Sequence, residues 1–236
     1  MQMKIAETDI RIFRAKQLTV EFQPPPTVVD VEMFEGALTP SENDTDTPLS
    51  SVKVEVYFRG ESRDEIRRNV SRFCALLQKG TPLTLDGYRD RFMGYMTSNT
   101  TNKTITGKRY KAEFEFSGYW FSDEVELNFN EVSEFSFDAE GTRDAPCIIS
   151  MTALSFVEEL KITGFSDEII ITNINRGETV VIDGEQGTVM VDGKNKFLDV
   201  TLWEFPFLTV GEKKTHNIVV SSDRMMVSIR YRPMWL

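Results

Sequence analysis

The side chains that could do chemistry in this sequence come without the partners that catalysis needs. His216 is the only histidine, and the run KKTHNIV around it holds no serine or cysteine motif that would require a base. Neither G-x-S-x-G nor H-E-x-x-H occurs, and there is no glycine-rich phosphate loop. We therefore expect His216 to be structural and expect no catalytic triad, zinc-hydrolase site or nucleotide cofactor.

Carboxylates are the other candidates, because a pair of them can hydrolyse a glycosidic bond. The second half of the chain offers Glu158, Glu159, Asp183, Glu185, Asp192, Asp199 and Glu204. Asp183 and Asp192 each precede a glycine, which turn formation explains, and carboxylates in the turns of an acidic chain are usually solvated. No D-x-[DN]-x-[DN]-G calcium loop is present. We expect no enzyme activity, no metal and no cofactor.

The amino-acid composition and net charge exclude further classes of protein. With 27 Lys and Arg against 37 Asp and Glu, the net charge of −10 argues against recognition of a nucleic acid. Cys74 and Cys147 lie far apart in no metal-ligand spacing, so we expect reduced thiols. No apolar run is long enough to cross a membrane, and charged residues follow Met3 where the apolar core of a secretory signal would lie. These features predict synthesis in a cytoplasm and no membrane span.

The first half reads as strands around one helix. Residues 52–58 alternate between apolar and polar side chains, as in a half-buried strand. Ser62 and Glu65 form a capping box, and Ile66, Val70, Phe73 and Leu77 then recur at helical spacing. Gly80 is placed as the C-terminal cap, which predicts a helix over residues 62–79. The polar, acidic stretch 39–51 is expected to be an exposed loop. The strand-like alternation of apolar and polar residues weakens near residue 130, and we place a domain boundary there.

The second half, residues 131–236, reads as about eight strands with no helical pattern, which is typical of an antiparallel β-sandwich. Two Asp-Gly dipeptides, at 183–184 and 192–193, lie between β-branched runs and indicate hairpins. The aromatic residues near the end of the chain could stack on sugars or pack in a core or interface; they are Trp203, Phe205, Phe207 and Trp235. We expect Trp235 to fold the tail down.

Two stretches of the sequence together resemble the distal tail proteins of long-tailed, siphovirus-like bacteriophages and prophages. They are VKVEVYFRGESRDEIRRNVSRFCALLQKGTPLTLDGYRDRFMGYM and RGETVVIDGEQGTVMVDGKNKFLDVTLWEFPFLTVGEKKTHNIVVS. The resemblance implies a mainly β fold. Residues 1–130 would form a split β-barrel with one flanking helix, and residues 131–236 a galectin-like antiparallel β-sandwich.

The resemblance also implies a function. Similar proteins form hexameric rings that join the tail tube to the tail tip or baseplate, with the N-terminal domains in the ring and the C-terminal domains supporting host-adhesion parts. The implied partners are further copies of the chain, the tail tube protein, a tail-tip or tail-associated protein, and receptor-binding or baseplate proteins. The expected location is the tail tip of the virion, after synthesis in the bacterial cytoplasm. The alternative is a carbohydrate-binding sandwich for sugars of the host cell wall.

Within that function, ring closure is a head-to-tail contact for which strand edges of the first domain are natural donors. We predict that the strand with Val52, Val54 and Val56 and the loop with Thr45 and Asp46 contribute to this contact. Trp203 is predicted to contact a partner or, in the alternative, a sugar.

Overall fold

The chain forms two compact units, residues 1–121 with Leu236 and residues 122–235. The computed structural model describes residues 2–25, 28–32, 41–46, 48–101, 108–211 and 214–236. The fold is mainly β with one α-helix and antiparallel sheets, which confirms the predicted fold class. No helix in these ranges is both long and apolar enough to span a membrane.

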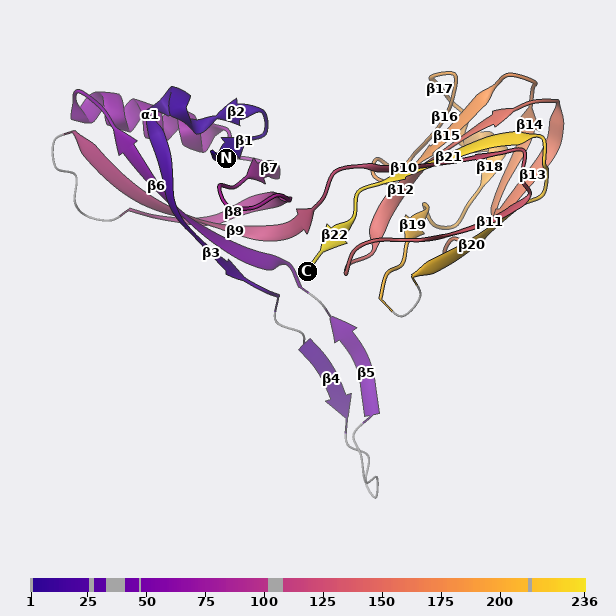
Figure 1. Ribbon diagram of the computed structural model, residues 1–236, viewed down its shortest axis with the longest axis horizontal. Coiled ribbons are helices and arrows are strands. Elements are labelled where there is room, and N and C mark those ends of the chain that lie inside the picture. The colour runs from indigo at the N-terminus through magenta and orange to yellow at the C-terminus, as the bar shows by residue number, and fades with distance from the viewer. Residues whose placement is uncertain (1, 26–27, 33–40, 47, 102–107, 212–213) are drawn as a thin grey trace. The chain divides into compact units, whose positions relative to one another are not determined.

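The first unit is built on one open antiparallel sheet in the order β2-β1-β7-β8-β9-β6-β3 (Figure 1). Its strands are β1 (Lys4–Ile5), β2 (Thr8–Asp9), β3 (Ala15–Gln23), β6 (Ser50–Arg59), β7 (Thr81–Thr84), β8 (Arg91–Thr101) and β9 (Arg109–Phe121), and a 3-10 helix, η1, spans Ile10–Phe13. The alternation predicted for residues 52–58 is confirmed, since Val52, Val54, Val56 and Phe58 are fully buried along β6. In the described residues the sheet remains open, with β2 and β3 at its two ends.

Helix α1 (Arg63–Ala75) covers the buried face of this sheet through Phe73. The ring of Phe73 lies 6.0 Å from that of Phe13, 5.3 Å from that of Phe58 and 4.9 Å from that of Phe114, measured between centroids. The predicted cap is confirmed, because the Ser62 hydroxyl accepts a hydrogen bond from the Glu65 backbone N–H at 3.2 Å.

The end of the helix differs from the prediction. It finishes at Ala75 rather than near residue 79, and Gly80 is not its cap. A Cβ atom at Gly80 would clash with the Tyr95 ring, so glycine leaves room for this exposed side chain from β8. This contact depends on tertiary packing, whereas the sequence alone indicated a helix cap.

Residues 39–51 were predicted to be a loop, and this prediction is corrected for Ser41–Asp46. That segment forms β5, which pairs with β4 (Val28–Glu32) in a two-stranded antiparallel sheet. Both strands come after β3 and before β6 in the sequence. Ser, Asn and Asp are depleted in strands, so neither their propensity nor their pattern indicated one. Thr39, Pro40 and Thr47 lie outside the described residues.

The second unit is an antiparallel β-sandwich, as predicted. One sheet runs β10-β21-β12-β15-β16-β17 with β19 paired to β12, and the other runs β11-β20-β13-β14-β18. The first contains β10 (Val125–Asn130), β12 (Ala145–Ala153), β15 (Thr179–Asp183), β16 (Thr188–Val191), β17 (Lys194–Asn195), β19 (Phe207–Leu208) and β21 (Met225–Tyr231). The second contains β11 (Glu134–Asp138), β13 (Val157–Thr163), β14 (Ile169–Ile174), β18 (Val200–Thr201) and β20 (Thr215–Val220). The 3-10 helix η2 (Phe197–Asp199) and β22 (Met234–Trp235) complete the described elements.

Both predicted Asp-Gly turns are present, in different forms. Asp192 and Gly193 have φ values of 47° and 77° and connect β16 to β17, the pattern of a two-residue hairpin with positive φ at both positions. Asp183 instead ends β15, and its carboxylate accepts backbone hydrogen bonds from Glu185 and Gln186 at 2.8 and 2.9 Å. The turn between β15 and β16 therefore contains four residues.

The boundary between the two units lies earlier in the sequence than the position predicted after residue 130. The division lies between Phe121 and Ser122, because β10 pairs with β21 from Val125 to Asn130 and so belongs to the sandwich. Strand pairing over a separation of about 100 residues decides this boundary, and local composition does not report it.

The contacts of Phe73 predict its contribution to stability. Phe73→Ala should lower the free energy of unfolding by about 3–5 kcal/mol, because it removes a fully buried ring that touches three others. Leu76→Ala, at a partly exposed position on the turn after α1, is the matched control and should cost less than about 1 kcal/mol. Chemical denaturation followed by circular dichroism measures both, and equal losses would contradict this role for Phe73.

Candidate interaction surfaces

The predicted interface strand is not at an edge. Val52, Val54 and Val56 are fully buried, and β6 pairs with β3 on one side and with β9 on the other. Their assignment to a contact with another chain is therefore corrected to a place in the core. The alternation of residues 52–58 correctly predicted which face is apolar, but it carries no information on which strands flank β6.

The available edge is β3, which in the described part of the chain pairs with β6 alone. This strand is nine residues long, and its register shifts between Gln17 and Thr19, which leaves Leu18 as a bulged residue. Leu18 is 42% exposed although it is apolar. An outer edge of this length presents unpaired backbone groups to which a strand of another chain can bond.

Thr45 and Asp46, the other predicted interface residues of this unit, lie on β5. In the two-stranded sheet Thr45 pairs with Val29 and Asp46 with Val28. Their role in an interface stays a prediction, and it now attaches to a hairpin rather than to a loop.

Trp203 lies on an exposed apolar surface of the sandwich. Its side chain is 89% exposed, that of Leu198 is fully exposed and that of Phe197 is 46% exposed. We call these three residues the Trp203 surface; they lie within seven positions of one another, between β17 and β19. Large apolar side chains this exposed are candidates for a contact with a protein or another ligand, and that role of Trp203 stays a prediction.

The remaining aromatic residues of this region serve the domain itself. The Phe205 ring lies 6.3 Å from the Phe197 ring and supports the Trp203 surface from a partly buried position. Trp235 donates a hydrogen bond from its indole N–H to the Ser122 hydroxyl at 2.8 Å. The prediction that Trp235 holds the tail down is thereby confirmed.

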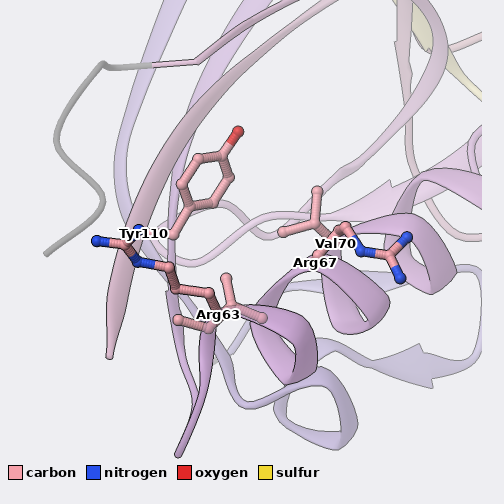
Figure 2. A pocket seen from close by; sticks show the side chains of 5 residues that line it. Arg63, Arg67, Val70 and Tyr110 are labelled. Carbon is pink, nitrogen blue, oxygen red and sulfur yellow. The ribbon is translucent and has the colours of Figure 1, made fainter. Parts of the chain in front are cut away.

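A hollow on the exposed side of α1 combines an apolar floor with a basic rim, and we call it the α1 hollow. It encloses about 150 Å³ and is lined by Arg63, Ile66, Arg67, Val70 and Tyr110. Ile66 and Tyr110 are buried, while both arginines are exposed. Figure 2 shows the two guanidinium groups on opposite sides, with Val70 and Tyr110 between them. Such a site fits an anionic partner that also has some apolar surface.

His216 has the structural role that its sequence context predicted. It is 6% exposed, its ring stacks on Phe137 at 5.5 Å, and its Nε2 atom lies 3.0 Å from the Thr209 carbonyl oxygen. These contacts hold the imidazole ring inside the sandwich, where little of its surface is accessible.

The other candidate groups are also accounted for by structure. Asp183 caps a turn, and Glu185 forms an ion pair with Arg232 at 3.1 Å. Burial raises the pKa of the Cys74 thiol and also that of Cys147, which disfavours the reactive thiolate form at both positions. In the ranges that the structure describes, no group of three or more acidic, cysteine or histidine side chains gathers as a metal site.

Sequence reasoning singled out Trp203 as a candidate and missed the rest of these surfaces. The β3 edge depends on strand order, and the α1 hollow needs Tyr110 from β9 beside helix residues that lie 40 to 47 positions earlier. A signal for the hollow was present, since Arg63 and Arg67 are spaced to lie side by side on the exposed face of the helix.

Comparisons with known proteins identify one family model and several solved structures that this chain resembles. Residues 140–235 match the model of the siphovirus-type tail component, C-terminal domain. The fold is similar to that of the crystallised Dit protein of phage SPP1, described as a paradigm of the hub adsorption apparatus in phages that infect Gram-positive hosts. That match has a TM-score of 0.78 and 11% identity, and it covers 100% of this chain and 99% of the other.

Two structures of the activated baseplate of phage P2, with calcium and with strontium, each contain a similar chain. The TM-score is 0.55 and the identity 8% in each case, with 97% of both chains covered. A sequence comparison with curated proteins gave no match.

The exposure of Trp203 can be tested by fluorescence. Among the three tryptophans, Trp120 is 6% exposed and Trp235 partly buried, so iodide should quench chiefly the emission of Trp203. Trp203→Phe should remove most of the quenchable emission and change the free energy of unfolding by less than about 0.5 kcal/mol. Trp235→Phe is the control and should leave the quenchable share in place. A large quenchable share that survives Trp203→Phe would place Trp203 in the interior.

Proposed function

We propose a hub role for this chain from the premise that it is a distal tail, or baseplate hub, protein of the siphovirus type. In this proposal, copies of the chain assemble into a hexameric ring between the tail tube and the tail tip or baseplate. The observation that carries the proposal is the combination of a family match over residues 140–235 with a Dit-like fold along the entire chain.

The first unit supplies the ring contact. The β3 edge is free on its outer side in the described residues, and the exposed bulge residue Leu18 breaks its regular register. When an edge of one copy meets a different surface of the next, the contact is heterologous, and it closes into a ring if the rotation between copies divides a full turn. The proposed ring places every copy in an equivalent position.

The second unit supplies the outward contact. The Trp203 surface offers apolar side chains on a segment that the sandwich core does not need, which suits the docking of host-adhesion or baseplate proteins. The tail tube protein and a tail-tip or tail-associated protein are the partners proposed for the ring. The protein would be synthesised in the bacterial cytoplasm and would act in the virion.

The proposed role is structural and not enzymatic. His216 and Asp183, which were the clearest candidates for acid or base chemistry, bind within the sandwich and in a turn. Their side chains therefore stabilise the domain that carries the docking surface.

A second function is favoured by one observation, the exposure of Trp203. An open indole can stack on a sugar ring, so the sandwich could bind host cell-wall polysaccharide without catalysis. Phe205 supports the neighbouring ring of Phe197, which would extend such a platform.

The mass of the assembled protein tests the hub proposal. The purified chain, at increasing concentration and with or without tail tube protein, should give a defined species of six times the 27.1 kDa chain mass by native mass spectrometry and light scattering. Trp203→Ala should leave this species intact and weaken the capture of purified baseplate or receptor-binding protein by roughly tenfold or more. A chain that remains a monomer under all these conditions would overturn the ring.

The same variant separates the two functions. If Trp203→Ala abolishes binding to purified wall polysaccharide and leaves protein capture unchanged, the Trp203 surface binds sugar. If it weakens protein capture and the wild type binds no polysaccharide, the surface is a protein-docking site.

A further inference from the structure

We infer that the acidic β4–β5 hairpin of one copy docks on the basic α1 hollow of the next copy. This inference deepens the proposed function and rests on it, because it names the contact through which neighbouring copies recognise each other. Three features carry it: the charge of the hollow, the opposite charge of the hairpin, and their places at opposite ends of the β6–β9 ladder.

The α1 hollow is a basic exception in an acidic protein. The helix contains four arginines and two acidic residues, whereas the whole chain has a net charge of −10. Of the nearby acidic groups, Glu65 lies 3.3 Å from Arg14, and Asp64 lies 3.9 Å from Arg67, so Arg67 already has one acidic neighbour. Arg63 has no ion pair within the described residues and is exposed at the rim of the hollow. An incoming carboxylate would therefore meet guanidinium donors that can bind it with two hydrogen bonds.

The hairpin has the complementary composition. Its described strands, Val28–Glu32 and Ser41–Asp46, contain five acidic residues and no lysine or arginine. The remaining strand positions include three valines, at 28, 29 and 31. This sequence combines negative charge with short apolar side chains, which matches the basic rim and apolar floor of the α1 hollow.

The register of the hairpin indicates that it needs a partner. Asp30 and Asp44 occupy paired backbone positions of the hairpin. An isolated two-stranded hairpin is at best marginally stable in water. A cationic surface that binds this hairpin would supply the packing that two strands lack.

The place of each feature in the first unit favours a contact between copies. The hairpin joins the sheet at Ser50, the first residue of β6, where Ser50 pairs with Gly118. Tyr110 of the hollow pairs with Phe58, eight residues further along the same ladder, or about 26 Å away at the usual rise of a strand. One end of the unit therefore presents the acidic element and the other end the basic one. Two different and complementary patches on one chain suit head-to-tail association of identical copies.

Charge reversal tests the contact. Arg63→Glu with Arg67→Glu should raise the concentration needed for ring formation by roughly tenfold or more, because it places like charges across the interface. Asp30→Lys with Asp44→Lys should have a similar effect, and it keeps a like-charged pair inside the hairpin, so the stability of the hairpin is not the variable. The chain that carries all four changes should recover part of the assembly, since the two introduced lysines can pair with the two introduced glutamates while Glu32, Glu42 and Asp46 keep the hairpin partly acidic.

The controls separate this contact from net charge and from folding. Arg176→Glu with Arg224→Glu changes the net charge by the same amount at exposed sites of the sandwich and should leave assembly unchanged. Thermal unfolding of each variant should match that of the wild type, because Arg63 and Arg67 are exposed. Assembly of the wild type should weaken from about 50 to about 500 mM NaCl more steeply than assembly of the neutral variant Arg63→Gln with Arg67→Gln.

Cross-linking identifies the two surfaces directly. In an equal mixture of isotope-labelled and unlabelled Arg67→Lys protein, a zero-length carbodiimide reagent should join Lys at position 67 to acidic residues of the hairpin, in peptides that combine both isotopes. Peptides that join these segments only within one copy would overturn the inference, because they would show the hairpin folded back on its own helix.

The outcomes distinguish this contact from the hub role. A ring that forms normally in both reversal variants would overturn the docking of the hairpin and leave the proposed function standing. A wild-type chain that never assembles would overturn the ring and this contact together. Loss of assembly in each reversal variant with partial recovery in the fourfold variant would support both.

Discussion

The packing of Phe73 against the sheet is the contact on which the first unit depends. One ring from α1 touches rings from η1, β6 and β9, so a single side chain joins three elements that are distant in the sequence. Since α1 is 13 residues long and would be marginal alone in water, this packing stabilises the helix as well as the core. The exposed side of α1 is thereby held in a fixed place beside Tyr110, which creates the hollow.

The two units use β structure for different purposes. In the first, alternation along β6 places its apolar face in the core, and β2 and β3 are the end strands of the sheet in the described residues. In the second, two sheets enclose a shared core, and the segment between β17 and β19 carries Trp203 on its surface. A rigid interior with contacts placed at edges and loops suits a component of a larger assembly.

Basic and acidic residues of the first unit are also concentrated on separate elements. The chain is acidic overall, which keeps separate copies soluble, and its basic residues on α1 and acidic residues on the β4–β5 hairpin are concentrated on different elements. In the proposed ring, electrostatic complementarity of this kind would favour one orientation of neighbouring copies over others.

The sequence by itself determined the fold class, the apolar face of β6, the capped start of α1 at Ser62 and the Asp192-Gly193 hairpin. Each of these depends on periodicity or turn chemistry within a few residues. It also carried the resemblance that the C-terminal match supports. Only the tertiary structure decided which strand is an edge, that Ser41–Asp46 is a strand, that β10 belongs to the sandwich, and that Trp203 is exposed while Val52 is buried. Those properties depend on which distant segments pair and pack together, and local patterns of residues do not specify these partners.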